Sequence, residues 1–243
     1  MNSKFYSMSN ELGSNSLIFA TEEEISLTLK KQENNKFIDK KNHFYYSEIK
    51  ELKDYESSRF DKLIISNSNG LDDAVMDILS NLHVEHLSIN DEFFNRKYNG
   101  KFKFVKNITV NYLSVSYDFS LFPELQTLHF TKSIKKNSKV DGVGSVTKLI
   151  FSDLKLGLLG DINLFANAVS LEELIVGKSD LRTLSGVESL ISLKSLEIMN
   201  SPRLAEIDAL TKLNELSSIR IVNCKKLVKK ELCELFGEHT LKM

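Results

Sequence analysis

Residues 171–176 read LEELIV, residues 193–198 read LKSLEI and residues 216–221 read LSSIRI. The three stretches share apolar residues at their first, fourth and sixth positions, and they start 22 and 23 residues apart. A pattern that returns at a nearly fixed interval indicates an internal repeat, in which each copy buries its apolar side chains against the next copy. The interval therefore decides which fold the sequence predicts.

Weaker copies of the same apolar skeleton extend towards the N-terminus. Eight copies start at residues 60, 84, 105, 125, 146, 171, 193 and 216, at intervals of 24, 21, 20, 21, 25, 22 and 23 residues. Leucine-rich repeats have periods of about 20–29 residues. The chain therefore resembles the leucine-rich repeat family over about residues 60–235, most strongly in the last three copies. Positions are counted from the first residue of each copy.

That resemblance implies an α/β fold, a curved right-handed coil whose short strands form a concave parallel sheet of about eight strands. The strands are expected at positions three to five, and the side chains at positions one, four and six are expected to form one shared core. The chain would return between strands through turns, 3₁₀ pieces or short helices. One such helix is predicted over residues 72–79, where Val75, Ile78 and Leu79 have helical spacing behind acidic residues.

The composition changes near residue 60. Residues 1–59 are rich in Phe, Tyr and charged residues, whereas the apolar skeleton runs through the rest of the chain. The two prolines, Pro123 and Pro202, form no linker between these parts. We therefore predict an N-terminal capping region over residues 1–59 and a leucine-rich repeat domain over residues 60–243.

The ends of a repeat coil need polar caps, because the terminal repeats would otherwise expose their apolar side chains. Residues 229–236, which are followed by Gly237, predict a C-terminal capping helix. In the N-terminal region, residues 16–20 and 25–29 are typical of short strands, and residues 33–36 are typical of a turn.

In the family pattern, the ninth position carries a polar side chain that hydrogen-bonds the backbone of the turn after the strand. The residues at this position are Ser68, Glu92, Leu113, Ser133, Leu154, Ser179, Ser201 and Cys224. The Cys matches an accepted variant, and each Ser can donate or accept a hydrogen bond. Leu113 and Leu154 cannot, so we expect less regular turns there.

Composition argues against several classes of partner. The chain has 32 Lys and Arg against 33 Asp and Glu, so its net charge of -1 provides no general attraction to nucleic acid or to an anionic membrane. No apolar run approaches the about 20 residues of a membrane span, and no secretion signal is recognised. Two cysteines, Cys224 and Cys233, are too few for a disulfide framework and favour a reducing, cytoplasmic setting.

The sequence offers little support for catalysis. His83 and His86 form an H-x-x-H pair, but no Cys or His cluster completes a metal site, and scattered surface histidines are the simpler interpretation. We expect His86 to face outward and His83 to precede its strand. The segment from Gly142 to Gly144 is too short to hold a phosphate and is interpreted as a loop. The sequence therefore predicts no enzyme, no cofactor and no metal; catalysis by residues 1–59 remains a third, weaker hypothesis.

Four lysines are concentrated in one segment: Lys132, Lys135, Lys136 and Lys139. They are typical either of a contact with nucleic acid or an acidic partner, or of a solvated loop. The segment has no Arg and no interleaved aromatic residue, which favours the loop.

One part of the concave face is predicted to bind a partner. Ile150 and Ile175 should be lateral neighbours at position five, with Met199 diagonal to them and charged residues around the rim. An apolar centre inside a charged rim is typical of protein–protein hot spots, although β-branched residues also favour strands for local reasons. The predicted partner-binding residues are Tyr112, His129, Lys148, Ile150, Glu173, Ile175, Lys178, Glu197, Met199 and Arg220.

The resemblance implies a non-enzymatic binding module, since a rigid curved sheet offers a large preorganised surface. The favoured hypothesis is a cytoplasmic immunity protein that neutralises a bacterial toxin, and the frequent Lys, Asn and Ile residues are typical of an AT-rich genome. The alternative is a regulatory or targeting subunit of a cellular enzyme. In either case the expected partner is a protein, not nucleic acid or a membrane.

Overall fold

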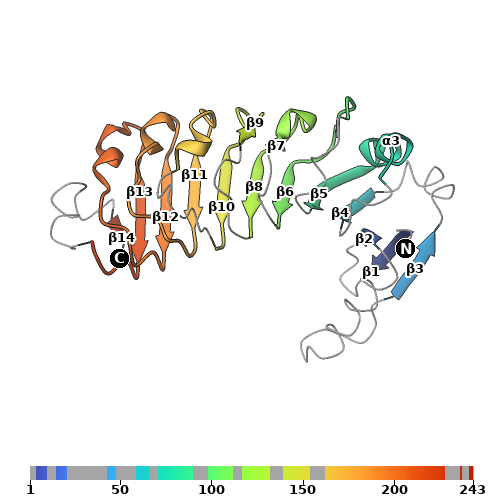
Figure 1. The fold of residues 1–243 in the computed structure, drawn as a ribbon, viewed down its shortest axis with the longest axis horizontal. Coiled ribbons are helices and arrows are strands. Elements are labelled where there is room, and N and C mark those ends of the chain that lie inside the picture. The colour runs from blue at the N-terminus through green and yellow to red at the C-terminus, as the bar shows by residue number, and fades with distance from the viewer. Residues whose placement is uncertain are drawn as a thin grey trace. The chain divides into compact units, whose positions relative to one another are not determined.

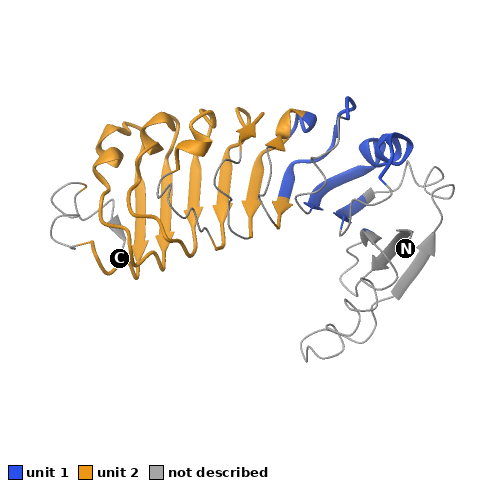
Figure 2. Ribbon diagram, viewed as in Figure 1, with its two compact units in different colours: residues 1–108, 121–124 blue, residues 109–120, 125–243 orange. Residues whose placement is uncertain are grey.

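The computed structural model describes residues 4–9, 15–20, 43–47, 59–65, 71–89, 98–111, 117–131, 139–153, 162–227, 236 and 241–242. The chain divides into two compact units (Figure 2). Unit 1 contains residues 1–108 and 121–124, and unit 2 contains residues 109–120 and 125–243. This division differs from the boundary expected after residue 59, which stays a prediction.

Unit 1 contains five strands in the spatial order β5-β4-β2-β1-β3. Their bounds are β1 Lys4–Ser9, β2 Asn15–Ala20, β3 His43–Ser47, β4 Arg59–Ile65 and β5 His83–Ile89. The β1 strand pairs antiparallel with β2 and β3, whereas β2 pairs parallel with β4, and β4 with β5. The strand predicted over residues 16–20 is therefore present as β2. The strand predicted over residues 25–29 and the turn over 33–36 lie outside the described residues.

The predicted helix is α3, Asp73–Asn81, between β4 and β5 (Figure 1). Asp72 caps it, because its Oδ1 accepts a hydrogen bond of 2.9 Å from the backbone N–H of Val75. The apolar side chains predicted to face the core, among them Ile78 and Leu79, are buried. The sequence thus located both the start of this helix and its buried face. No helix in the described part of the chain is long and apolar enough to cross a bilayer.

Unit 2 contains a parallel sheet in the order β14-β13-β12-β11-β10-β8, and Figure 1 shows β8 and β10 to β13 side by side with their arrows pointing the same way. Their bounds are β8 Thr127–Phe130, β10 Lys148–Phe151, β11 Glu173–Val176, β12 Ser195–Met199, β13 Ser218–Val222 and β14 Leu241–Lys242. A further strand, β6 Asn107–Val110, lies at the boundary of the units. Each of the eight predicted repeats therefore has its strand, and from β6 onward the strand starts at position three.

The residues at position four show the register directly. Leu128, Leu149, Leu174, Leu196 and Ile219 are successive partners on β8, β10, β11, β12 and β13. All five are buried, as are the position-one and position-six side chains with one exception. This lateral register of buried side chains every 20 to 25 residues confirms the leucine-rich repeat fold.

The exception is Leu216, the position-one residue of the last repeat, which is half-buried rather than buried. The next strand, β14, pairs with Ile219 and Arg220 of β13, beyond the level of Leu216. Among the described residues, no strand pairs with β13 at the level of Leu216. The predicted C-terminal capping helix, residues 229–236, lies outside the described residues apart from Phe236.

The return segments use 3₁₀ turns, as the repeat pattern predicts, and one small additional sheet, which it did not predict. The turns are η3 Phe119–Leu121, η4 Asn163–Phe165, η5 Val187–Ser189 and η6 Asp208–Lys212, and the small sheet pairs β7 Tyr117–Asp118 with β9 Val140–Asp141. Phe165 packs on the stacked rings of Phe130 and Phe151, with ring centroids 5.5 and 5.2 Å away. Aromatic side chains thus join a return segment to two strands.

The ninth position forms a buried polar ladder in the last three repeats. Ser179 Oγ and Ser201 Oγ are hydrogen-bonded at 2.7 Å, Ser201 Oγ donates to the Met199 carbonyl at 3.4 Å, and Cys224 Sγ lies 3.6 Å from the Val222 carbonyl. Burial raises the pKa of the Cys224 thiol, which keeps it protonated as a donor. The remaining ninth-position residues, Leu113 and Leu154 included, lie outside the described residues.

Ser201→Ala should destabilise unit 2 by about 1–3 kcal/mol, because the buried Ser179 hydroxyl loses its partner. Urea denaturation would measure the loss. The double variant Ser179→Ala/Ser201→Ala should lose little more stability than Ser201→Ala, because it removes the buried Ser179 hydroxyl that would otherwise lack a hydrogen-bond partner. Ser195→Ala, on the solvent side of β12, is the matched control. If the stability losses of Ser179→Ala and Ser201→Ala simply add in the double variant, the hydrogen bond between the two serines does not stabilise unit 2.

Candidate functional site

The candidate site lies on the solvent side of the unit 2 sheet. Parallel strands in register bring side chains of the same position next to each other. At position five, Ile150 stands between His129 and Ile175, and Glu197 stands between Ile175 and Arg220. We call these five residues the position-five row.

The centre of the position-five row is apolar. Ile150 and Ile175 are direct partners on β10 and β11, and both are half-buried. Met199 is also half-buried and follows Glu197 by two residues on β12, so its side chain shares the same face. Diagonal neighbours of this kind lie about 7–8 Å apart, within reach of a long side chain. The three residues predicted to form the apolar centre are thus on one face and close to one another.

A glycine lies beside this centre, where the chain passes close to the backbone of the preceding repeat. Gly177 follows Ile175 by two residues, and a Cβ atom there would lie 3.2 Å from the carbonyl oxygens of Phe151 and Ser152. On the other side of the centre, His129 Nε2 and Ser152 Oγ are hydrogen-bonded at 2.6 Å. The chain at Gly177 therefore packs closely on the backbone after β10, and the His129 imidazole is hydrogen-bonded to a side chain of that same segment.

Charged residues on the sheet form ion pairs between repeats, and two of these pairs, Lys148 with Glu173 and Glu197 with Arg220, belong to the predicted rim. Three ion pairs join opposite charges at the same position of neighbouring repeats: Lys148 with Glu173 at 2.8 Å, Glu172 with Lys194 at 2.9 Å, and Glu197 with Arg220 at 2.6 Å. Their side chains are about a quarter to a half exposed, so water screens them and each contributes little to stability. A partner would therefore meet apolar side chains between closed ion pairs, not a surface of one sign.

The structure brings together eight of the ten predicted partner-binding residues: His129, Lys148, Ile150, Glu173, Ile175, Glu197, Met199 and Arg220. Lys178 is exposed in the bend that follows β11. Tyr112 lies outside the described residues. Sequence reasoning missed Ser152 and the lateral ion pairs, although opposite charges at one position of successive repeats were a readable signal for the pairs.

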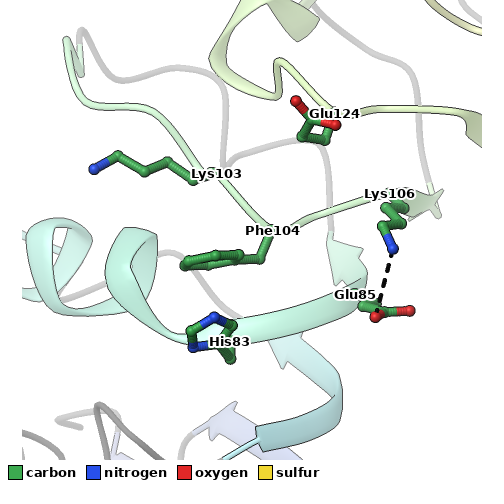
Figure 3. A pocket seen from close by; sticks show the side chains of 6 residues that line it. All are labelled: His83, Glu85, Lys103, Phe104, Lys106 and Glu124. Carbon is green, nitrogen blue, oxygen red and sulfur yellow. Dashed lines mark ion pairs between the residues drawn. The ribbon is translucent and has the colours of Figure 1, made fainter.

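A pocket that the sequence did not predict lies in unit 1. It has a volume of about 350 Å³ and is lined by His83, Glu85, Lys103, Phe104, Lys106 and Glu124 (Figure 3). The rings of Phe104 and His83 are 3.7 Å apart between centroids, and Lys106 Nζ is 3.6 Å from Glu85 Oε1. His83, Phe104 and Glu124 each stand directly before position one of their repeat, outside the apolar pattern, which is why the pattern gave no signal for them.

The histidines differ in one respect from the prediction. His86 is exposed, as expected, but His83 is the first residue of β5 and does not precede the strand. The reason is that β4 and β5 have seven residues each and begin one residue before position one. Within the described residues, no group of three or more His, Cys, Asp and Glu side chains is placed to hold a metal ion. The absence of a metal site in the whole protein stays a prediction.

Comparisons with known proteins give structural likenesses alone. No protein-family model matches the sequence, and no curated protein matches it. Internalin InlF of Listeria monocytogenes is similar with a TM-score of 0.45 and 17% identity, over 81% of this chain and 57% of the internalin chain. TLR13 in its complex with ssRNA13 is similar with a TM-score of 0.45 and 17% identity, over 79% of this chain and 33% of the TLR13 chain.

This chain thus spans about half of the internalin chain and a third of the TLR13 chain. The fold is assigned from the strands of this chain: they recur at a nearly constant interval, run parallel, and place their buried side chains in lateral register. The chain therefore has a leucine-rich repeat fold.

Proposed function

We propose that the protein is a non-enzymatic binding module that holds a globular protein partner on the position-five row. The observation that supports this proposal is the adjacency of Ile150 and Ile175, half-buried on a face whose other described side chains are mostly polar. A pair of isoleucines in the middle of a sheet face gains free energy when a partner covers it. The ion pairs on either side would form the polar rim of that contact.

The finer proposal is an immunity protein that neutralises a bacterial toxin. A rigid sheet held by lateral hydrogen bonds loses little conformational entropy on binding, which favours the tight complexes that inhibition requires. The closed ion pairs add a second property. Partner groups that approach them must match an existing arrangement of charges, and this favours specificity over attraction at long range.

Coexpression with a toxin-like protein encoded beside this gene tests the proposal. The expected result is restored growth of cells that make the toxin, together with a stable complex of the two purified proteins. Growth arrest despite production of the folded protein would contradict the immunity role. If a stable complex with an abundant cellular enzyme is found instead, the role is that of a regulatory subunit and the binding proposal is retained.

Charge reversal of the rim, Glu173→Lys with Glu197→Lys, should weaken that complex about tenfold or more while the protein stays folded. Each new lysine faces an existing cation, Lys148 or Arg220, so the rim acquires a strong positive charge that the partner does not match. Calorimetric titration would measure the affinity. Glu172→Lys with Lys194→Glu keeps a closed pair outside the position-five row and is the control. Unchanged affinity of the reversed variant would place the contact elsewhere.

A further inference from the structure

The unit 1 pocket has one carboxylate whose charge is not matched. Of its two acidic residues, Glu85 is paired with Lys106. No ion pair or hydrogen bond reaches the carboxylate of Glu124 from any residue that the structure describes. Lys103 is the remaining cation of the lining, and in Figure 3 its side chain extends away from Glu124. The pocket therefore combines one closed ion pair with one carboxylate that is open to a ligand.

The second component of the pocket is an aromatic face. The Phe104 ring stacks on His83 with an angle of 31° between their planes, so His83 occupies one of its two faces. Figure 3 shows Glu124 beyond Phe104, on the side away from His83. The available part of the ring and the carboxylate thus border the same space.

The walls of the pocket are held by backbone hydrogen bonds and buried rings. The Lys106 N–H donates to the Glu85 carbonyl at 3.0 Å, and the Phe102 N–H donates to the Leu121 carbonyl at 2.8 Å. Phe102 and Phe122 are buried and stacked, with ring centroids 5.1 Å apart. The segment that carries Phe104 is therefore fixed to the segment that carries Glu124.

We propose that this pocket binds the guanidinium group of an arginine side chain from a protein partner. A guanidinium is planar and cationic, so it stacks on an aromatic face while its N–H groups donate to a carboxylate in its plane. The volume of about 350 Å³ is at the lower end of ligand pockets, which span about 300–1,000 Å³, and suits one long side chain. The pocket is partly open to solvent, which suits a side chain presented by a protein and not an enclosed metabolite.

This inference rests on the proposed function for the source of the arginine, but its test needs no partner. The full-length protein is titrated with N-acetyl-L-arginine methylamide, and the ring resonances of His83 and Phe104 are followed by NMR. The expected result is saturable shifts of both rings at about millimolar concentrations, because a single side chain supplies few contacts. The citrulline analogue, which has a planar but uncharged end group, should bind about tenfold more weakly.

Two variants identify the groups that bind the probe. Glu124→Gln and Phe104→Leu should each weaken binding of the arginine probe about threefold to tenfold. The matched control is Glu215→Gln, because Glu215 is an exposed glutamate at the same place of the last repeat, directly before position one. Glu215→Gln should leave the affinity unchanged.

Several outcomes would overturn the inference. They are an absence of ring shifts, equal binding of the citrulline analogue, or an affinity that Glu124→Gln does not change. Shifts caused by inorganic phosphate but not by the arginine probe would make the pocket an anion site formed by its lysines. Because the probe binds without a partner, these failures are distinct from a failure of the position-five row to bind a toxin.

Discussion

Leu174→Asp unfolds unit 2. Leu174 is fully buried on β11, between Leu149 and Leu196 on the neighbouring strands. Removing a buried leucine side chain costs about 2–5 kcal/mol, and keeping a carboxyl group in an apolar core raises its pKa by up to about 3–5 units. Together these costs are comparable with the entire stability of an ordinary domain, about 5–15 kcal/mol. Circular dichroism should show the loss of strand signal and of a cooperative thermal transition.

The neighbouring residue supplies the control. Ile175→Asp introduces the same side chain one residue later on the same strand, where the residue is half-buried on the solvent side. It should keep the cooperative transition, because water solvates its carboxylate. Equal melting temperatures for Leu174→Asp and the unaltered protein would refute the assignment of the two faces of β11.

The double variant Ile150→Asp/Ile175→Asp should remain folded and lose at least about 100-fold in affinity for its partner. Hot-spot residues contribute about 2 kcal/mol or more each, and every 1.4 kcal/mol is a factor of ten in Kd. The two carboxylates would also lie side by side, so a partner would have to desolvate both. Surface plasmon resonance with the toxin, or with another partner found by coexpression, would measure the loss.

Ile191→Asp is the corresponding control. Ile191 is 65% exposed, more than any other large hydrophobic residue described, but it lies in a turn before β12 and not on the sheet face. If exposure of an isoleucine were enough to make a contact, this variant would bind as weakly as the double variant. If the position-five row is the contact, Ile191→Asp binds normally.

The fold was predictable because the same apolar positions recur in every repeat, so each repeat gives independent support for the same register. Position four alone specifies the register of five strands of unit 2, and an error in one repeat would conflict with its neighbours. The capped helix α3 was predictable for a local reason, since Asp72 and the apolar spacing after it act within one segment. Leu216, in the last predicted repeat, is half-buried, which the repeat pattern did not predict.

Other features could not be read from the repeat. The N-terminal segment has no repeat of its own, so the pairing of β2 with β4 depends on contacts distant in sequence, and a change of composition at residue 60 does not reveal it. The rim was predicted as residues but not as ion pairs. The lining of the unit 1 pocket includes Phe104 and Glu124, which lie one residue outside the pattern and come from successive repeats.

The lateral ion pairs constrain how such a protein grows by gene duplication. A tandem copy of residues 171–192 alone would place each new Glu172 and Glu173 beside an identical glutamate, and like charges directly opposite one another destabilise a sheet. Copying residues 171–215 as one block would instead place each new Glu172 beside a lysine, as Glu172 and Lys194 are paired now. Duplication of a single repeat is therefore expected to cost stability at this place in the sheet, whereas duplication of the two-repeat block is not.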